Sequence, residues 1–161
     1  QIKDFMAVDE KGRLILADAL SYAEKFKPDV VIDLATLTGA VVVALGHFAT
    51  GMMGNDQTTM DALKVAGDTT YERVCQLPMY DEYEQLIKGD IADVKNVGGR
   101  WGGAITAAFF LKKFIGKYKW VHLDIAGTAI LEANQDYTPK GGSGVGVRLL
   151  VEFLRSWKKE K

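Results

Sequence analysis

Apolar residues recur along the chain with two different spacings, and their alternation predicts a succession of helices and strands. One group is separated by three or four residues, as on one face of an α-helix; its members are Leu16, Leu20, Ala23 and Phe26. We therefore predict a helix over residues 13–27, ended by Pro28. Residues 30–32 are β-branched and apolar throughout, which is typical of a strand covered on both faces of a parallel sheet.

The same analysis predicts further elements. Additional strands are expected over residues 1–8, 48–53 and 120–124. Additional helices are expected from the loop at residues 33–38 through Leu45, from a cap at Thr58 or Thr59 to near Gly67, and over residues 80–88, 104–115 and 147–157. Repeated alternation of strands and helices favours an α/β fold, a three-layer sandwich with a largely parallel central sheet. No linker or repeat interrupts the pattern, so residues 1–161 are predicted to form a single domain.

Composition narrows the class of protein. The 20 basic and 21 acidic side chains are interleaved, so no broad positive field is expected for nucleic acid. No apolar run approaches the roughly 18 residues of a membrane span, and the first residues lack a signal-peptide pattern. Cys75 is the only cysteine, which excludes an internal disulfide and favours a cytoplasmic location. The chain opens on Gln1 instead of Met, which suggests that it was cut from something longer.

Carboxylates follow three of the predicted strands. In open α/β sheets ligands bind beyond the carboxyl ends of the strands, and Asp9, Asp33 and Asp124 are expected there. At such a place a carboxylate can bind a cation or align a catalytic base. An aspartate in the same position can also simply cap the following helix, and the pattern alone leaves both readings open.

Two glycine clusters, at residues 98–103 and 141–146, each precede an apolar helical segment. Neither has the spacing of a P-loop or a dinucleotide fingerprint, so tight turns and close helix packing explain them better than an anion- or nucleotide-binding module. Ser143 lacks the flanking pattern of a catalytic serine. His47 and His122 are the only histidines, too few for a histidine-rich metal site, and His122 is expected to be a core residue.

A resemblance to a known family rests on several segments in order. Residues 9–20, Asp-Glu-Lys-Gly-Arg-Leu-Ile-Leu-Ala-Asp-Ala-Leu, resemble the Asn-Thr-Asp-Ala-Glu-Gly-Arg-Leu signature of the leucyl (cytosol) aminopeptidases and the helix that continues it. Further matching segments lie at residues 33–40, 44–47, 81–83, 98–100, 104–107, 122–128 and 144–148. The resemblance covers nearly all of the chain and implies the C-terminal half of a two-metal catalytic domain.

The resemblance implies roles for individual residues. Asp9 falls on a metal-bridging aspartate, and Arg13 on the arginine that holds a bicarbonate ion acting as general base. The backbones of Gly12 and Leu37 would help to hold that anion. Thr36, Leu37 and Gly39 match the loop that binds the peptide backbone, and Ala126 matches a position in the pocket for the N-terminal side chain. In the family, two divalent ions, zinc or manganese, activate the water that releases the N-terminal amino acid, and the subunits commonly assemble as hexamers.

The sequence departs from that pattern in two respects. Lys11 stands where the signature has a metal-ligating glutamate, and a protonated amine cannot bind a cation. The family's other metal ligands and a catalytic lysine precede the signature, whereas only eight residues precede Asp9 here. Two hypotheses follow: part of an aminopeptidase whose isolated chain is inactive and holds no stoichiometric metal pair, or a non-catalytic scaffold or assembly domain derived from the family.

Overall fold

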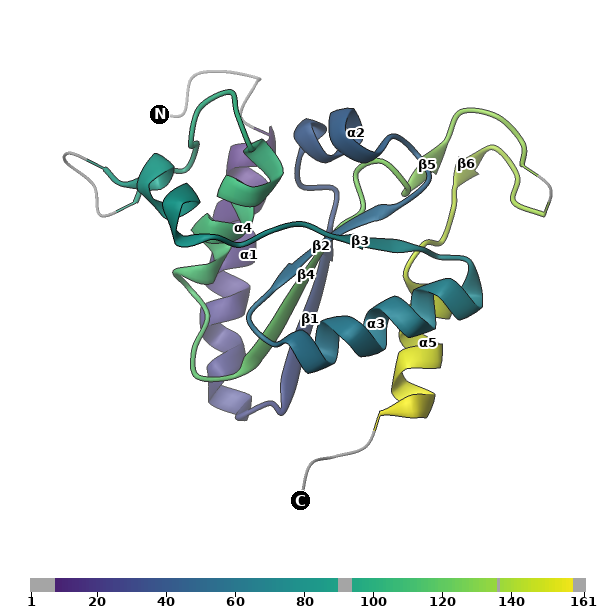
Figure 1. The fold of residues 1–161 in the computed structure, drawn as a ribbon, viewed down its shortest axis with the longest axis horizontal. Coiled ribbons are helices and arrows are strands. Elements are labelled where there is room, and N and C mark those ends of the chain that lie inside the picture. The colour runs from purple at the N-terminus through teal and green to yellow at the C-terminus, as the bar shows by residue number, and fades with distance from the viewer. Residues whose placement is uncertain (1–7, 90–93, 136, 158–161) are drawn as a thin grey trace.

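A computed structural model describes residues 8–89, 94–135 and 137–157, with side chains from Gly12 onward (Figure 1). Its helices are α1 (Val8–Ala23), η2 (Glu24–Phe26), α2 (Gly39–Leu45), α3 (Gln57–Thr70), η3 (Asp81–Ile87), α4 (Gly103–Lys112) and α5 (Val147–Ser156). Its strands are β1 (Val30–Ala35), β2 (Thr50–Gly54), β3 (Val74–Gln76), β4 (Lys119–Asp124), β5 (Ile130–Leu131) and β6 (Gly141–Gly142).

The central sheet has the strand order β1-β4-β2-β3. β1 runs parallel to β4 and β2 runs parallel to β3, while β2 and β4 are antiparallel. Two of the three pairings are therefore parallel, which confirms the largely parallel sheet. β5 and β6 form a separate antiparallel pair. Among the described strands, β1 pairs only with β4 and lies at one edge of the sheet.

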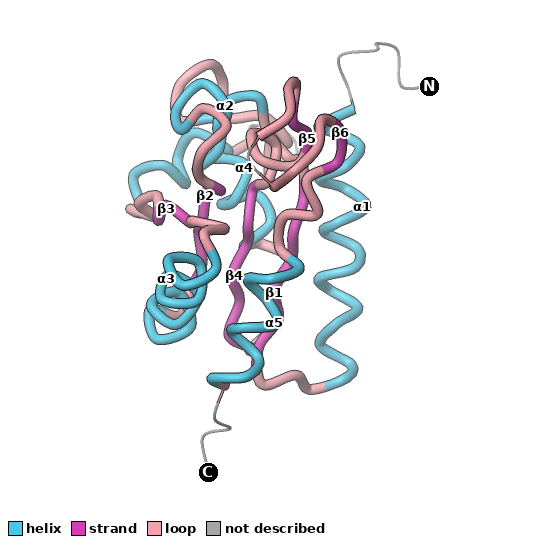
Figure 2. The backbone as a smooth tube through the Cα atoms, turned by 90° about the vertical axis from the view of Figure 1, so that its right-hand side faces the viewer, coloured by secondary structure: helices cyan, strands magenta, loops and turns pink. Residues whose placement is uncertain are grey.

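Helices cover both faces of the sheet, which confirms the three-layer α/β sandwich. Figure 2 shows α1 on one side of β1 and β4 and α3 on the other. The alternation of side chains along β4 explains this arrangement, because Trp120 packs with α1 and α4 while Val121 and Leu123 pack with α3 and α5. Each face of the sheet thus has its own apolar core.

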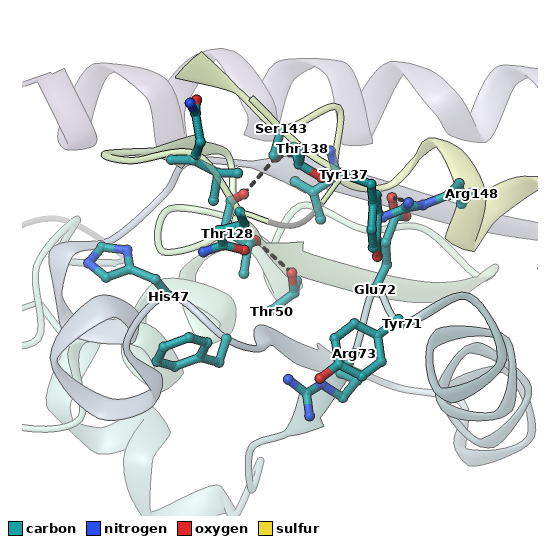
Figure 3. A pocket seen from close by; sticks show the side chains of 15 residues that line it. His47, Thr50, Tyr71, Glu72, Arg73, Thr128, Tyr137, Thr138, Ser143 and Arg148 are labelled. Carbon is teal, nitrogen blue, oxygen red and sulfur yellow. Dashed lines mark hydrogen bonds and ion pairs between the residues drawn. The ribbon is translucent and has the colours of Figure 1, made fainter. Parts of the chain in front are cut away.

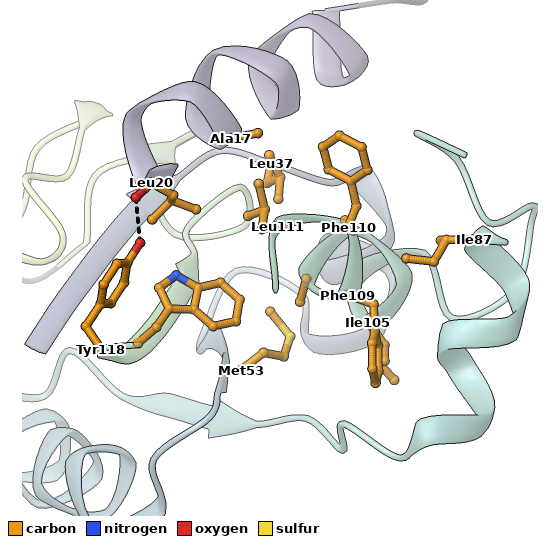
Figure 4. Close-up of a cluster of buried hydrophobic side chains, with 13 residues drawn as sticks. Ala17, Leu20, Leu37, Met53, Ile87, Ile105, Phe109, Phe110, Leu111 and Tyr118 are labelled. Carbon is orange, nitrogen blue, oxygen red and sulfur yellow. Dashed lines mark hydrogen bonds between the residues drawn. The ribbon is translucent and has the colours of Figure 1, made fainter. Parts of the chain in front are cut away.

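The core between the sheet, α1 and α4 is the more aromatic of the two (Figure 4). Trp120 and Phe109 are fully buried in it. Tyr118 is buried in the same core and donates its hydroxyl hydrogen to the Leu20 carbonyl oxygen at 2.7 Å, which links the residue before β4 to α1. Burial raises the pKa of the Tyr118 phenol.

Several predicted boundaries are corrected. Residues 1–7 of the first predicted strand lie outside the described residues, and Val8 already begins α1, so residues 9–13 are helical and do not form a loop after a strand. The helix predicted over residues 13–27 is α-helical only as far as Ala23, where α1 ends, and the chain continues as the 3-10 helix η2. The segment expected to be an amphipathic helix over residues 80–88 is the 3-10 helix η3.

The third long helix begins earlier and ends later than predicted. Its N-cap is Asp56, not Thr58 or Thr59, and it continues past Gly67 to Thr70. The Asp56 carboxylate accepts hydrogen bonds from the Thr59 N–H at 2.9 Å and the Thr59 hydroxyl at 2.6 Å. The threonine therefore acts as the donor that satisfies the capping aspartate.

Replacement of this cap should give a pH-dependent loss of stability. The Thr59 hydroxyl lowers the pKa of Asp56 below its usual value of 3.8. The ionised carboxylate therefore stabilises the fold above pH 3.8, and this contribution disappears as the pH falls through the lower folded-state pKa. We expect Asp56→Ala to cost about 1 kcal/mol at neutral pH. Urea unfolding of both proteins should show a smaller difference at about pH 2; a difference that grows on acidification would contradict this assignment.

Candidate functional site

The predicted substrate-binding residues gather at the carboxyl ends of β1 and β4. A pocket of about 520 Å³ lies there between α1 and the loop that leads from β1 into α2. It is lined by Gly12, Ile15, Leu16, Ala19, Leu34, Ala35, Thr36, Leu37 and Ile125. Figure 1 shows the beginning of α1 and the whole of α2 at the same end of the sheet. The structure therefore brings Gly12, Thr36 and Leu37 to one pocket, although 23 residues separate Gly12 from Thr36.

Asp124 joins this pocket to Ala126. The carboxylate is almost fully buried at the end of β4, and its Oδ1 atom accepts hydrogen bonds from the Leu37 N–H at 3.1 Å and the Ala126 N–H at 3.2 Å. The second oxygen accepts from the Thr38 hydroxyl at 2.7 Å. The sequence left open whether a strand-end aspartate binds a cation or caps the following helix. In the structure the carboxylate of Asp124 accepts hydrogen bonds from backbone N–H groups of two different loops.

The loop at residues 36–38 continues directly into α2. The Thr38 hydroxyl oxygen accepts the Val41 N–H at 3.1 Å and so caps this helix. Gly39 is the first helical residue, and nothing lies within 4 Å of the Cβ that a larger residue would carry there. The predicted backbone-binding loop is therefore a capped entry into a short helix.

Arg13 has a different environment. Its side chain is buried, and Nη1 donates to the Asn96 carbonyl oxygen at 2.5 Å, on the segment that precedes α4. Its helical neighbour Gly12 lines the pocket, whereas Arg13 is not among the lining residues. Asp9 lies in the first turn of α1, and its side chain is outside the described residues.

Asp33 does not terminate its strand, contrary to the sequence prediction. It lies within β1, where its carboxylate accepts hydrogen bonds from His122 Nδ1 at 2.6 Å and Trp120 Nε1 at 2.7 Å. His122 is fully buried, as expected for a core histidine, and no described residue hydrogen-bonds its Nε2 atom. This buried network was missed, although the alternation in residues 120–124 places Trp120, His122 and Asp124 on one face of the strand.

Glycines in the two clusters allow close packing at some positions and positive-φ turns at others, as predicted; the turn glycines are Gly99, Gly141 and Gly144. A Cβ at Gly103 would lie 2.9 Å from Ala40 Cβ, and one at Gly146 would lie 2.4 Å from Leu34 Cδ2. Gly146 also has a positive φ of 96°, a conformation that favours glycine. The Ser143 hydroxyl donates to the Thr128 carbonyl oxygen at 2.7 Å, a turn contact.

A second pocket, of about 490 Å³, lies beside β2 and the β5–β6 pair (Figure 3). Among its lining residues is the buried Glu72, which accepts hydrogen bonds from the Gly146 and Leu149 N–H groups at 3.0 and 2.9 Å and from Arg148 Nε at 3.0 Å. Glu72 thereby joins the end of α3 to the start of α5. None of the residues predicted for substrate or metal binding lines this second pocket.

Comparison with known proteins decides the family. The model of the "Cytosol aminopeptidase family, catalytic domain" matches residues 4–151. The chain belongs to the cytosol aminopeptidase family. It is 63% identical over 147 residues to a probable cytosol aminopeptidase of Geobacter sp. (strain M21), a match that covers 91% of this chain and 30% of that protein.

Two other family members give the same picture. Probable cytosol aminopeptidases of Geotalea uraniireducens and Geobacter sulfurreducens are 55% and 54% identical over 158 and 156 residues. These matches cover 98% and 97% of this chain and 32% of each relative. The chain therefore spans about a third of the length of the curated relatives that it matches.

The described carboxylates do not make up a metal centre of this family. Across residues 12–89, 94–135 and 137–157, no group of three or more His, Cys, Asp or Glu side chains is placed to hold a metal ion. Asp33 and Asp124 both accept hydrogen bonds from other groups of the protein.

Among the residues that the structure describes, no helix has the length and apolar character needed to cross a bilayer.

Proposed function

We propose that this chain supplies the peptide-binding wall of an aminopeptidase active site and does not hydrolyse peptides by itself. The observation that supports this most is the pocket shared by Gly12, Thr36 and Leu37, together with the hydrogen bond that the Ala126 N–H donates to the Asp124 carboxylate. The loop at residues 36–39 would hold the peptide backbone, and the region of Ala126 would receive the N-terminal side chain. The substrates would be peptides with a free N-terminus. We propose neither nucleic acid nor a membrane as a partner. The protein would act in the cytoplasm.

The hydrolytic step is assigned to groups beyond the described residues. Two zinc or manganese ions would supply the activated water in the complete site. Asp9 is the one proposed metal ligand in this chain, and Arg13 with the Gly12 and Leu37 backbones is the proposed bicarbonate site. In the structure the Leu37 N–H donates to Asp124, so anion binding at Leu37 would require this N–H to be shared or released. Lys11 replaces the family's glutamate, and its charge opposes a cation at that place.

A chimaera tests the proposal. The matching 158 residues of this chain, which include Lys11, would replace the corresponding segment of the Geotalea uraniireducens protein, with Lys11 or with Lys11→Glu. We expect hydrolysis of leucine anilide by the Lys11→Glu chimaera with added Mn²⁺, much less by the Lys11 chimaera, and none by the isolated 161-residue chain. Elemental analysis of each protein reports its bound metal.

The alternative function, a non-catalytic scaffold or assembly domain, predicts other results. A folded Lys11→Glu chimaera that binds two metal ions and still does not hydrolyse the anilide would favour it. Metal-dependent hydrolysis by the isolated chain with Lys11 in place would instead overturn the assignment of the metal ligands to groups beyond it. These two outcomes can be told apart, because the first is measured on the Lys11→Glu chimaera and the second on the isolated chain.

Exposed apolar side chains on α1 and η2 support self-association of the isolated chain. Ile15 on α1 and Phe26 in η2 are each 71% exposed, and β1 is an edge strand among the described strands. Such apolar surfaces and unpaired edges commonly bind a second chain. We expect concentration-dependent association in sedimentation velocity, reduced by the double substitution Ile15→Lys and Phe26→Lys. A monodisperse monomer at all concentrations would contradict this expectation and the proposed homo-oligomer, a hexamer in the family.

A further inference from the structure

We propose that Asp124 is a positioning residue that sets the spacing between the peptide-backbone loop and the side-chain pocket of the proposed aminopeptidase site. This inference rests on the proposed function for its effect on substrates. Its structural part, that one carboxylate holds two loops in register, stands on the geometry of the chain alone.

Asp124 lies where the two loops diverge. The last paired residues of β1 and β4 are Ala35 and Asp124, and the ladder ends with a hydrogen bond from the Ile125 N–H to the Ala35 carbonyl oxygen at 2.9 Å. Beyond this point the loop after β1 turns into α2, while the loop after β4 forms the turn at residues 125–129. No further ladder bond fixes one loop to the other, so their spacing depends on contacts made after the strands end.

One carboxylate supplies these contacts to both loops. Oδ1 is shared by the Leu37 N–H, the Ala126 N–H and, at 3.4 Å, the Thr38 N–H, while Oδ2 accepts the Thr38 hydroxyl. Asp124 is 1% exposed, so water cannot replace a lost acceptor without entering the site. Hydrogen bonds to a carboxylate are stronger than those between neutral groups, so several of them on one side chain resist separation of the two loops.

A neutral isostere should disturb this arrangement. Asparagine has the size of aspartate, but only one of its two terminal atoms accepts hydrogen bonds. If the amide nitrogen of Asp124→Asn faces the Leu37 and Ala126 N–H groups, these two donors lose their acceptor. If it faces the Thr38 hydroxyl, the hydroxyl can rotate to accept, but the Leu37 and Ala126 N–H groups then donate to a neutral amide oxygen, a weaker acceptor than a carboxylate. In both orientations the bonds that link the two loops weaken, while the two strands stay paired.

Hydrogen exchange in the isolated chain tests the structural part. We expect the amides of Leu37, Thr38 and Ala126 to exchange about tenfold faster or more, and together, in Asp124→Asn, with amides in β1 and β4 little changed. Asp56→Asn is the matched control, because it makes the same change of carboxylate to amide at the aspartate that caps α3, away from both loops. Unchanged exchange at Ala126 in Asp124→Asn would overturn the proposal whether or not any aminopeptidase activity exists.

The active Lys11→Glu chimaera tests the effect on substrates. Asp124→Asn should raise KM and lower kcat/KM for leucine anilide by about 10–100-fold, because misplacement by about 1 Å can have such effects. The ratio of kcat/KM for leucine and alanine anilides should also change, since the pocket moves relative to the backbone loop. Asp56→Asn should leave both KM and this ratio unchanged. An Asp124→Asn chimaera that loses kcat equally for both substrates, with KM unchanged, would show a merely structural role and contradict the proposal.

Discussion

Asp33→Ala is expected to remove about 3–5 kcal/mol from the free energy of unfolding, because the substitution leaves two buried donors without their acceptor. His122 Nδ1 and Trp120 Nε1 both donate to this carboxylate, and both side chains are fully buried. Domains commonly have about 5–15 kcal/mol of stability in total, so the variant should unfold at much lower urea concentration.

A graded series of variants makes this expectation specific. Asp33→Asn retains one acceptor oxygen and should lose less than Asp33→Ala. Asp61→Ala is a suitable control, because Asp61 accepts a hydrogen bond from Gln57 at an exposed position on α3; its effect should be within about 0.5 kcal/mol. An Asp33→Ala variant that lost less than about 1 kcal/mol would show that the network contributes little.

The network also shows where sequence patterns stop being informative. A polar residue in an apolar run was interpreted as the end of a strand, whereas Asp33 is satisfied inside β1 by residues 87 and 89 positions away. Such a pairing depends on the register between β1 and β4, which no local window contains. The helix over residues 13–27 was predicted from apolar residues at helical spacing, and α4, α5 and β4 from continuous apolar segments. The helix α3 was predicted from a possible threonine cap and a terminal glycine, and both of its ends were wrong.

Short and irregular elements could not be predicted in the same way. β5 and β6 have two residues each, too few to show any period, and η3 was assigned as a helix without its 3-10 geometry. The candidate site was not predicted from periodicity. The α/β pattern indicates only that ligands bind near the carboxyl ends of the strands. The choice of Thr36, Leu37 and Ala126 came from the family motif, and the contribution of Asp124 required the folded positions of both loops.

Gly127→Ala is expected to cost about 3 kcal/mol, the upper part of the usual range for overpacking, and to deform the candidate site, because two backbone segments meet at this glycine. An added Cβ would lie 2.2 Å from the Gly46 carbonyl oxygen, far inside van der Waals contact. Gly46 is the C-cap of α2 and donates its N–H to the Val42 carbonyl oxygen at 2.8 Å, so it cannot move without α2. His47 Nδ1, on the residue after Gly46, also contacts the Gly127 carbonyl oxygen at 2.7 Å and bonds the same segment to the turn.

Relief of this overlap must move either the end of α2 or the turn that carries Ala126. We therefore expect Gly127→Ala to shift the amide resonances of Ala126 and Leu37 in addition to lowering the urea midpoint. Gly142→Ala is the matched control, since nothing lies within 4 Å of the Cβ position at Gly142; its stability should stay within about 0.5 kcal/mol of the parent. If Gly127→Ala were as stable as Gly142→Ala, the turn would have to be free to move away from α2. The close contact could then not limit the distance between the turn that carries Ala126 and the end of α2.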